Sequence, residues 1–274
     1  MERARLQAAR TTLTALTLLA AALATGCGAP GGDAGNTAGQ GAPLGEQGYR
    51  PAPEVAGAAM GPQGRIELEG TAPAAAVVRL ASPAGAALFA TADRVGAWRL
   101  VIPASGQPRL FGLSMSDNGR VVEAQGYLFV APDGVLARLR AGGGSEALGA
   151  RSAGLVALAL DYDNRRAATL SGVGAAGEAE SLRVDGVERG QATADAAGRF
   201  VLPLNEPLSP GAHDFDLAGA KREVRFSAAI DAPAPLAGAP FASSQIAAGW
   251  RVDWITPGGG EQTTLVLDAL APAP

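Results

Sequence analysis

The chain has 274 residues, a formal net charge of −4 and a single cysteine and histidine. One cysteine excludes a disulfide within the chain, and one Cys with one His cannot supply four ligands to a structural zinc ion. The acidic balance, with a pI near 5.2, argues against a surface that binds the phosphate backbone, so we expect no nucleic acid partner. Composition therefore restricts the function classes without naming an activity.

Residues 1–26 have the pattern of an export signal. Three arginines near the start, Arg3, Arg5 and Arg10, give a basic segment, and an apolar run follows from Leu13 to Leu23. That run is too short to cross about 30 Å of hydrocarbon as a helix, which favours a signal peptide over a membrane span.

The single cysteine lies four residues after this run ends, in Leu23-Ala24-Thr25-Gly26-Cys27. The segment resembles the lipobox of bacterial lipoproteins, although Ala24 stands where that family usually has leucine. The resemblance implies that the Cys27 thiol receives a diacylglycerol and becomes the new N-terminus, so that two acyl chains attach the chain to a membrane. Gly28, where the sorting pattern that keeps lipoproteins in the inner membrane has Asp, favours the outer membrane. An ordinary secretory signal or a buried thiol are the alternatives.

Residues 27–58 contain Gly, Ala and Pro with no cluster of large apolar side chains. Such a stretch cannot bury enough surface to offset the entropy of ordering, so we expect a disordered tether.

Beyond the tether, apolar and polar residues alternate in short runs that turn residues interrupt. This pattern predicts an antiparallel β-sandwich architecture, with no long amphipathic helix after the signal. The expected strands include residues 65–69, 77–80, 98–102, 109–113 and 127–130.

The chain contains an internal repeat. Thr91 to Trp98 reappears as Thr193 to Phe200 in the form T-A-D-x-x-G-x-aromatic, and Gly70–Leu80 matches Gly174–Val184 with Arg79 and Arg183 in equivalent places. A period of about one hundred residues predicts two tandem β-modules rather than a solenoid. In each copy the aspartate and glycine are expected to form a turn, and the aromatic residue to enter the core.

The second copy resembles the bacterial Ig-like modules of exported proteins. The motifs are the Val-Asp-Gly hairpin at 184–186, the turn segment at 194–200, and the Leu-Ser-Pro-Gly-Ala-His turn at 208–213. The resemblance implies an all-β fold of two tandem Ig-like antiparallel β-sandwich domains, at residues 59–147 and 148–274.

The C-terminal stretch predicts a hairpin that completes the second sandwich. Trp250, Val252 and Trp254 share one face of its first strand. We expect this face to belong to the core, with an aromatic ligand-binding surface at Trp250 and Trp254 as the alternative.

Residues that could support catalysis do not form a recognised motif. His213 is expected to have a structural role as the end of a turn, and Ser116-Asp117-Asn118 to form a hairpin turn. The Asp161–Asn164 segment offers oxygens to calcium but lacks the glycine and distant glutamate of an EF-hand loop. A catalytic pair of carboxylates of the glycosidase type is defined by the distance between them in space, so the sequence leaves this possibility open.

These features predict a lipid-anchored envelope protein, attached to the outer membrane through Cys27 and facing the periplasm or the cell surface. We expect a non-enzymatic binding or scaffolding role, with no cofactor or metal and with an envelope protein, peptidoglycan or another polysaccharide as partner. The alternatives are a lipid-anchored hydrolase with an unrecognised carboxylate site and an accessory subunit of an envelope secretion or assembly machine.

Overall fold

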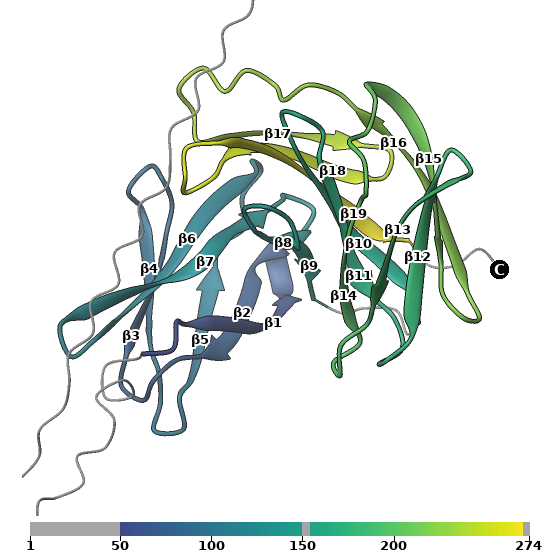
Figure 1. Ribbon diagram of the computed structural model, residues 1–274. Helices are drawn as coiled ribbons and strands as arrows, with labels where there is room; N and C mark the ends of the chain where they lie inside the picture. Colours follow the sequence, from purple (N-terminus) through teal and green to yellow (C-terminus); the bar gives the residue numbers. More distant parts are fainter. Residues whose placement is uncertain (1–49, 150–153, 271–274) are drawn as a thin grey trace, which may run out of the picture. The chain divides into compact units, whose positions relative to one another are not determined.

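A computed structural model describes residues 50–149 and 154–270, and the chain from Gly48 to Pro274 forms one compact unit. Strands are almost the only regular secondary structure of the described residues, which confirms the predicted all-β sandwich fold (Figure 1). They form no helix long and apolar enough to span a membrane.

The strands of the first module precede residue 150. They are β1 (Glu54–Met60), β2 (Ile66–Thr71), β3 (Val77–Ala81), β4 (Ala87–Thr91), β5 (Ala97–Ile102), β6 (Arg109–Asp117), β7 (Arg120–Val130), β8 (Leu136–Leu139) and β9 (Glu146–Leu148), with a 3-10 turn at Pro62–Gly64. Sheet A has the order β1-β2-β5, and sheet B the order β4-β3-β6-β7-β8-β9. All of these neighbours are antiparallel.

The second module is also built from two sheets. Its strands are β10 (Val156–Asp163), β11 (Ala168–Val173), β12 (Ala179–Val184), β13 (Val187–Thr193), β14 (Arg199–Pro203), β15 (Gly211–Ala218), β16 (Glu223–Ile230), β17 (Phe241–Ile246), β18 (Gly249–Ile255) and β19 (Glu261–Leu270). Sheet C has the order β14-β11-β10-β19-β18-β17, and sheet D the order β13-β12-β15-β16. The C-terminal hairpin thus joins the second sandwich, as predicted.

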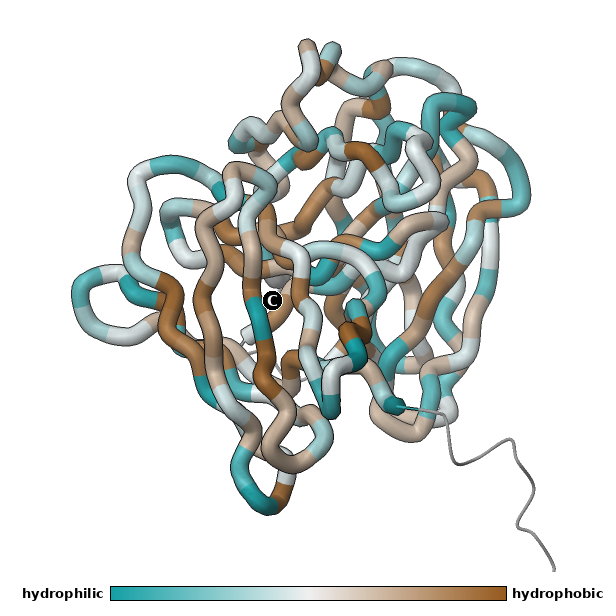
Figure 2. The backbone as a smooth tube through the Cα atoms, turned by 90° about the vertical axis from the view of Figure 1, so that its left-hand side faces the viewer, coloured by the Kyte–Doolittle hydropathy of each residue, from teal (hydrophilic) through white to brown (hydrophobic). Residues whose placement is uncertain are grey.

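Three hydrophobic clusters hold the described residues together. One fills the space between sheets A and B around Trp98, and a second fills the space between sheets C and D around Phe200. Exposed and buried residues alternate along strands with one buried face, as in β16, and hydrophilic and hydrophobic segments are interspersed along the strands in Figure 2. The third cluster packs sheet B of the first module against sheet C of the second.

We call this third cluster the junction core. Near it, β10 departs from alternation: Val156–Tyr162 are all buried, because Leu160 and Tyr162 pack in the second core while Asp161 accepts a hydrogen bond from Ser145 of the first module. The junction core contains Leu110, Phe129, Ala131, Ala137, Leu139, Trp250, Val252, Trp254 and Val266.

The repeated turn has the predicted construction in both modules. Asp93 Oδ1 accepts the backbone N–H groups of Val95 and Ala97 at 2.9 Å each. Asp195 Oδ1 does the same for Ala197 and Arg199, at 2.8 and 2.9 Å. The glycine that follows each aspartate has φ of 84° or 76°, a region that favours glycine.

The predicted match of Gly70–Leu80 with Gly174–Val184 is displaced by two residues. Ala92 N–H donates to Ala76 O, and Ala194 N–H donates to Glu178 O. Equivalent residues therefore differ by 102 in number in this segment, as Asp93 and Asp195 do in the repeated turn. Gly70 therefore corresponds to Gly172, and each leaves room for the aromatic ring of its module. As a consequence Arg79 is equivalent to Ser181 rather than to Arg183.

The first strand begins earlier than the predicted tether allows. Residues 54–58 lie within the predicted disordered segment 27–58, but they belong to β1, which pairs with β2. Val55 is buried in the first core, and this contact supplies the apolar burial that composition did not reveal. The sheets of the first module include β9, which ends at Leu148, one residue past the predicted boundary.

The second core contains a buried acidic side chain, that of Glu180. Glu180 lies at the position of the buried Val78 and is itself only 1% exposed, and no described group donates to its Oε2. Burial, with a smaller contribution from Glu178, raises the pKa of Glu180. Between the pKa of the unfolded chain, about 4.3, and the higher pKa in the native state, the native chain binds more protons than the unfolded chain. The free energy of unfolding therefore falls as pH rises through this range.

We predict that Glu180→Gln stabilises the protein by about 1–3 kcal/mol at pH 7, because the amide is neutral and needs neither a buried charge nor the uptake of a proton. The gain should shrink at pH 4, where both states are largely protonated. Urea unfolding at the two pH values measures it, with the exposed Glu261→Gln as the matched control. A gain that is equal at both pH values would contradict this account of Glu180.

Candidate functional site

The sequence predicts three site residues: Cys27, Trp250 and Trp254. Cys27 lies outside the described residues. Trp250 and Trp254 are 8% and 0% exposed and belong to the junction core, so the alternative of an aromatic ligand-binding face is wrong. The first module covers their rings: Phe129 lies 5.9 Å from Trp250, and Tyr127 lies 5.7 Å from Trp254, centroid to centroid.

Both indole N–H groups are satisfied inside the junction. Trp250 Nε1 donates to Asp133 Oδ2 of the first module at 2.8 Å, and Trp254 Nε1 donates to Thr264 Oγ1 at 3.1 Å. A buried indole with its donor occupied is part of the core rather than a ligand platform.

A polar cluster beside the junction core centres on Asp161. Its carboxylate accepts from Ser145 N and Oγ at 2.8 and 2.7 Å, from Thr264 Oγ1 at 2.6 Å and from Gln262 Nε2 at 3.1 Å. Burial raises the pKa of Asp161, and hydrogen bonds from Thr264, Ser145 and Gln262 oppose that shift. Gln262 also bonds Gly142 N and Arg140 O, so the cluster joins the glycine-rich loop of the first module to the second.

This arrangement argues against a calcium site at residues 161–164. The Asp161 oxygens are occupied by protein donors, and Asp163 Oδ1 accepts the N–H groups of Arg165 and Ala167 in a turn. Within residues 50–149 and 154–270, no group of three or more His, Cys, Asp or Glu could hold a metal ion.

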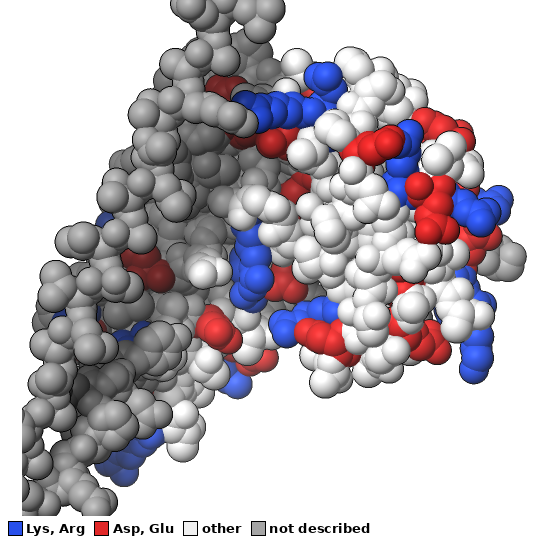
Figure 3. Space-filling model, in the orientation of Figure 1, with Lys and Arg blue, Asp and Glu red and all other residues white. Residues whose placement is uncertain are grey.

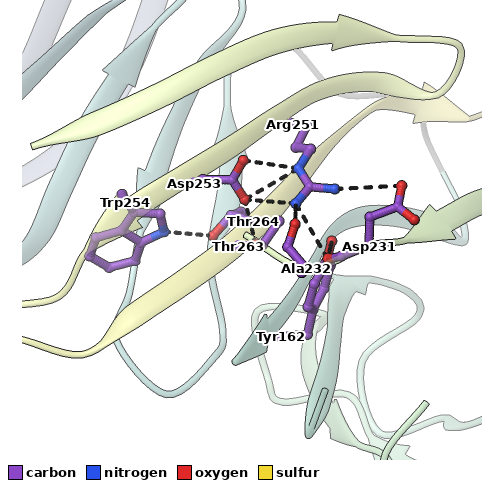
Figure 4. A network of polar contacts seen from close by, with 8 residues as sticks. All are labelled: Tyr162, Asp231, Ala232, Arg251, Asp253, Trp254, Thr263 and Thr264. Atoms are coloured by element: carbon purple, nitrogen blue, oxygen red, sulfur yellow. Dashed lines mark hydrogen bonds and ion pairs between the residues drawn. The ribbon is translucent and has the colours of Figure 1, made fainter. Parts of the chain in front are cut away.

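A second polar network joins β10, β18 and β19 to the segment that follows β16 (Figure 4). Arg251 makes a bidentate contact to the Asp253 carboxylate at 3.0–3.2 Å, and its Nη2 donates to Ala232 O at 2.8 Å. Thr263 Oγ1 donates to Asp253 at 2.5 Å, and Tyr162 OH donates to Asp231 O at 3.2 Å. The network anchors the segment that leads from sheet D to sheet C, which is a structural task.

His213 lies between Ser209 and Asp185, in an order that suggests a catalytic triad. Its Nδ1 is 2.6 Å from Asp185 Oδ2, while Nε2 is 3.3 Å from Ser209 Oγ but only 2.9 Å from the Ser209 carbonyl oxygen. Burial lowers the pKa of His213, but the hydrogen bonds to Ser209 O and Asp185 outweigh it and raise the pKa overall. An imidazole that donates from both nitrogens cannot take a proton from Ser209.

The geometry therefore assigns His213 a structural role, since it links two turns. Asp185 and Gly186 have φ of 52° and 79° in the β12–β13 hairpin, as the Asp-Gly sequence predicts. Asn118 and Gly119 have φ of 49° and 77° and form the β6–β7 hairpin, which confirms the turn interpretation of Ser116-Asp117-Asn118.

Acidic and basic side chains are mixed on the face drawn in Figure 3. A groove of about 1100 Å³ with the same mixed character is lined by both modules. Arg138 contacts Glu146 at 3.2 Å and donates to Val55 O at 3.2 Å, and Arg99 lies 3.8 Å from Glu69. We call this the polar groove; its charged lining residues are Glu54, Glu67, Glu69, Arg99, Arg138, Arg140, Glu146 and Arg199.

A second groove, of about 650 Å³, has a different chemistry. Its walls come from the β3–β4 turn, the β5–β6 loop and the start of β6 in the first module, and from the start of β17 in the second. We call it the apolar groove; its large apolar lining residues are Pro83, Leu88, Pro103, Pro108, Leu110, Phe111, Pro240 and Phe241. The prolines restrict the backbone, so these walls are largely preformed.

Arg109 is the one charged residue among the described residues that line the apolar groove. Its Nη2 donates to Pro103 O at 2.6 Å, and its guanidinium carbon lies 5.5 Å from the centre of the Phe111 ring. No described group accepts from its buried Nε, and burial lowers the pKa of Arg109. A concave apolar surface with one fixed polar group is the usual form of a small-molecule site.

Sequence reasoning found the strand at 109–113 but not this site. The groove forms only when Pro240 and Phe241 meet the first module across about 130 residues. The local signal was the spacing of Pro103, Pro108 and Arg109 around a loop that precedes an apolar strand.

No family model and no curated protein matches the chain. Among solved structures, the chain is similar to one described as "Biofilm associated protein - BSP domain", with 12% identity and a TM-score of 0.23. The match covers 62% of this chain and 28% of that chain.

Proposed function

We propose that the chain is a lipid-anchored envelope protein with a non-enzymatic binding or scaffolding role. Cys27 would attach it to the outer membrane, and the two sandwiches would present their surfaces to the periplasm or the cell exterior. The observation that carries the binding role is the apolar groove, because it is preformed, concave and built from both modules. An envelope protein or an envelope glycan is the proposed partner class.

The anchor is tested by Cys27→Ala. Two acyl chains give stable membrane attachment, so their loss should move most of the protein from the membrane to the soluble fraction. Membrane fractionation and incorporation of labelled palmitate measure this, with Thr25→Ala as a nearby control that keeps the thiol. A Cys27→Ala chain that sediments with membranes like the parent would refute lipid anchoring.

The binding role is tested by a variant that fills the apolar groove. Ala86 is exposed and lines the groove, so Ala86→Trp adds bulk there without removing a core contact. Affinity capture from membranes, followed by mass spectrometry, should recover partners with the parent chain and lose them with Ala86→Trp. Identical recovery would show that the groove is not the binding surface.

A lipid-anchored hydrolase is the second candidate, and the polar groove is the observation that favours it. Glu67 and Glu69 line the groove from one face of β2, about 7 Å apart along the strand. Hydrolysis of purified peptidoglycan or polysaccharide that disappears in Glu67→Gln or Glu69→Gln would establish this function.

A further inference from the structure

The apolar groove carries one uncompensated positive charge. Among the described residues of its lining none is acidic, and the protein partner of the Arg109 guanidinium is a neutral carbonyl oxygen, that of Pro103. In apolar surroundings a charge is poorly solvated and attracts an opposite charge more strongly than it would in water. The groove is therefore complementary to a ligand with an apolar body and one negative group.

We propose that the apolar groove binds a monoanionic amphiphile, an unbranched aliphatic chain that ends in a carboxylate. The carboxylate would contact the Arg109 guanidinium, which forms strong charge-assisted hydrogen bonds with such groups. The aliphatic chain would lie against the half-buried side chains of Leu88, Pro108 and Phe241. This inference rests on the proposed binding role of the apolar groove and adds a small-molecule ligand to the envelope partner proposed above.

The test uses the full chain with Cys27→Ala, which removes the proposed acyl chains that could compete for the groove. Calorimetric titration with dodecanoate, kept below its micelle concentration, should show saturable binding of one molecule per chain. Dodecyltrimethylammonium, which has the same aliphatic chain and the opposite charge, should not bind. Shortening the ligand to decanoate should weaken binding about tenfold, since each buried methylene contributes to affinity.

Variants assign the binding to this groove. Arg109→Gln should weaken dodecanoate binding by about 10- to 100-fold, and Arg109→Lys, which keeps the charge, by less. Ala86→Trp should abolish binding. Arg94→Gln removes an exposed arginine in the β4–β5 turn and should leave the affinity unchanged.

Absence of saturable binding, equal binding of the ammonium ligand, or equal affinity in the parent and Arg109→Gln would overturn the proposal. Circular dichroism confirms that each variant is folded, so a loss of binding is attributable to the groove. Failure here leaves the wider proposal intact if Cys27→Ala leaves the membrane and Ala86→Trp loses its partners. If those two results fail while dodecanoate binds, the wider proposal alone is wrong.

Discussion

Replacing Asp161 by alanine is expected to lower the free energy of unfolding by about 3–5 kcal/mol, because it leaves several buried hydrogen-bond donors without an acceptor. The Asp161 carboxylate accepts two hydrogen bonds from Ser145 and one each from Thr264 and Gln262. Without it, these donors stay buried at the junction with no replacement acceptor. Urea denaturation of the parent and variant measures the difference.

Asp163→Ala is the matched control for this prediction. Asp163 ends the same strand, but its carboxylate accepts only two backbone N–H groups in an exposed turn. Its loss should cost about 1 kcal/mol, because water can replace the carboxylate. Equal losses for Asp161→Ala and Asp163→Ala would show that the polar cluster at the junction contributes little to stability.

Replacing Trp254 by alanine is expected to destabilise the protein by about 3–5 kcal/mol, through lost burial and the cavity that remains. The indole is fully buried in the junction core, lies 5.7 Å from the Tyr127 ring and donates to Thr264. Val95→Ala, at a side chain that is 88% exposed, should change stability by less than about 0.5 kcal/mol. The same denaturation experiment measures both.

Trp254 and Asp161 share Thr264 as a partner, so their effects should not add. The double variant should lose less stability than the sum of the single variants. If the stability losses of the two single variants add up to that of the double variant, the junction is not one connected structure.

The parts of the fold that the sequence predicts correctly are local. The Asp93 and Asp195 turns, the Asp185-Gly186 hairpin and the C-terminal hairpin are set by residues a few positions apart, whose backbone preferences are visible in the sequence. From the repeat, the sequence also predicts correctly that the equivalent residues Trp98 and Phe200 are each buried in a hydrophobic core.

The features that were missed depend on distant pairing. The junction core joins Phe129 to Trp250, and a pattern of alternation cannot distinguish a second core from an exposed aromatic face. The first strand, from Glu54, was hidden because small residues pair with β2 around a single buried valine. The apolar groove likewise requires Phe241 to meet the first module, which no local pattern encodes.

Both candidate grooves depend on one central property, which is that the two sandwiches form a single folded body through the junction core. Differential scanning calorimetry of the full chain with Cys27→Ala tests this property most directly. We predict one endotherm whose calorimetric and van't Hoff enthalpies agree, as for a single cooperative unit. Two separate endotherms, each unchanged by Trp254→Ala at the junction, would contradict the account.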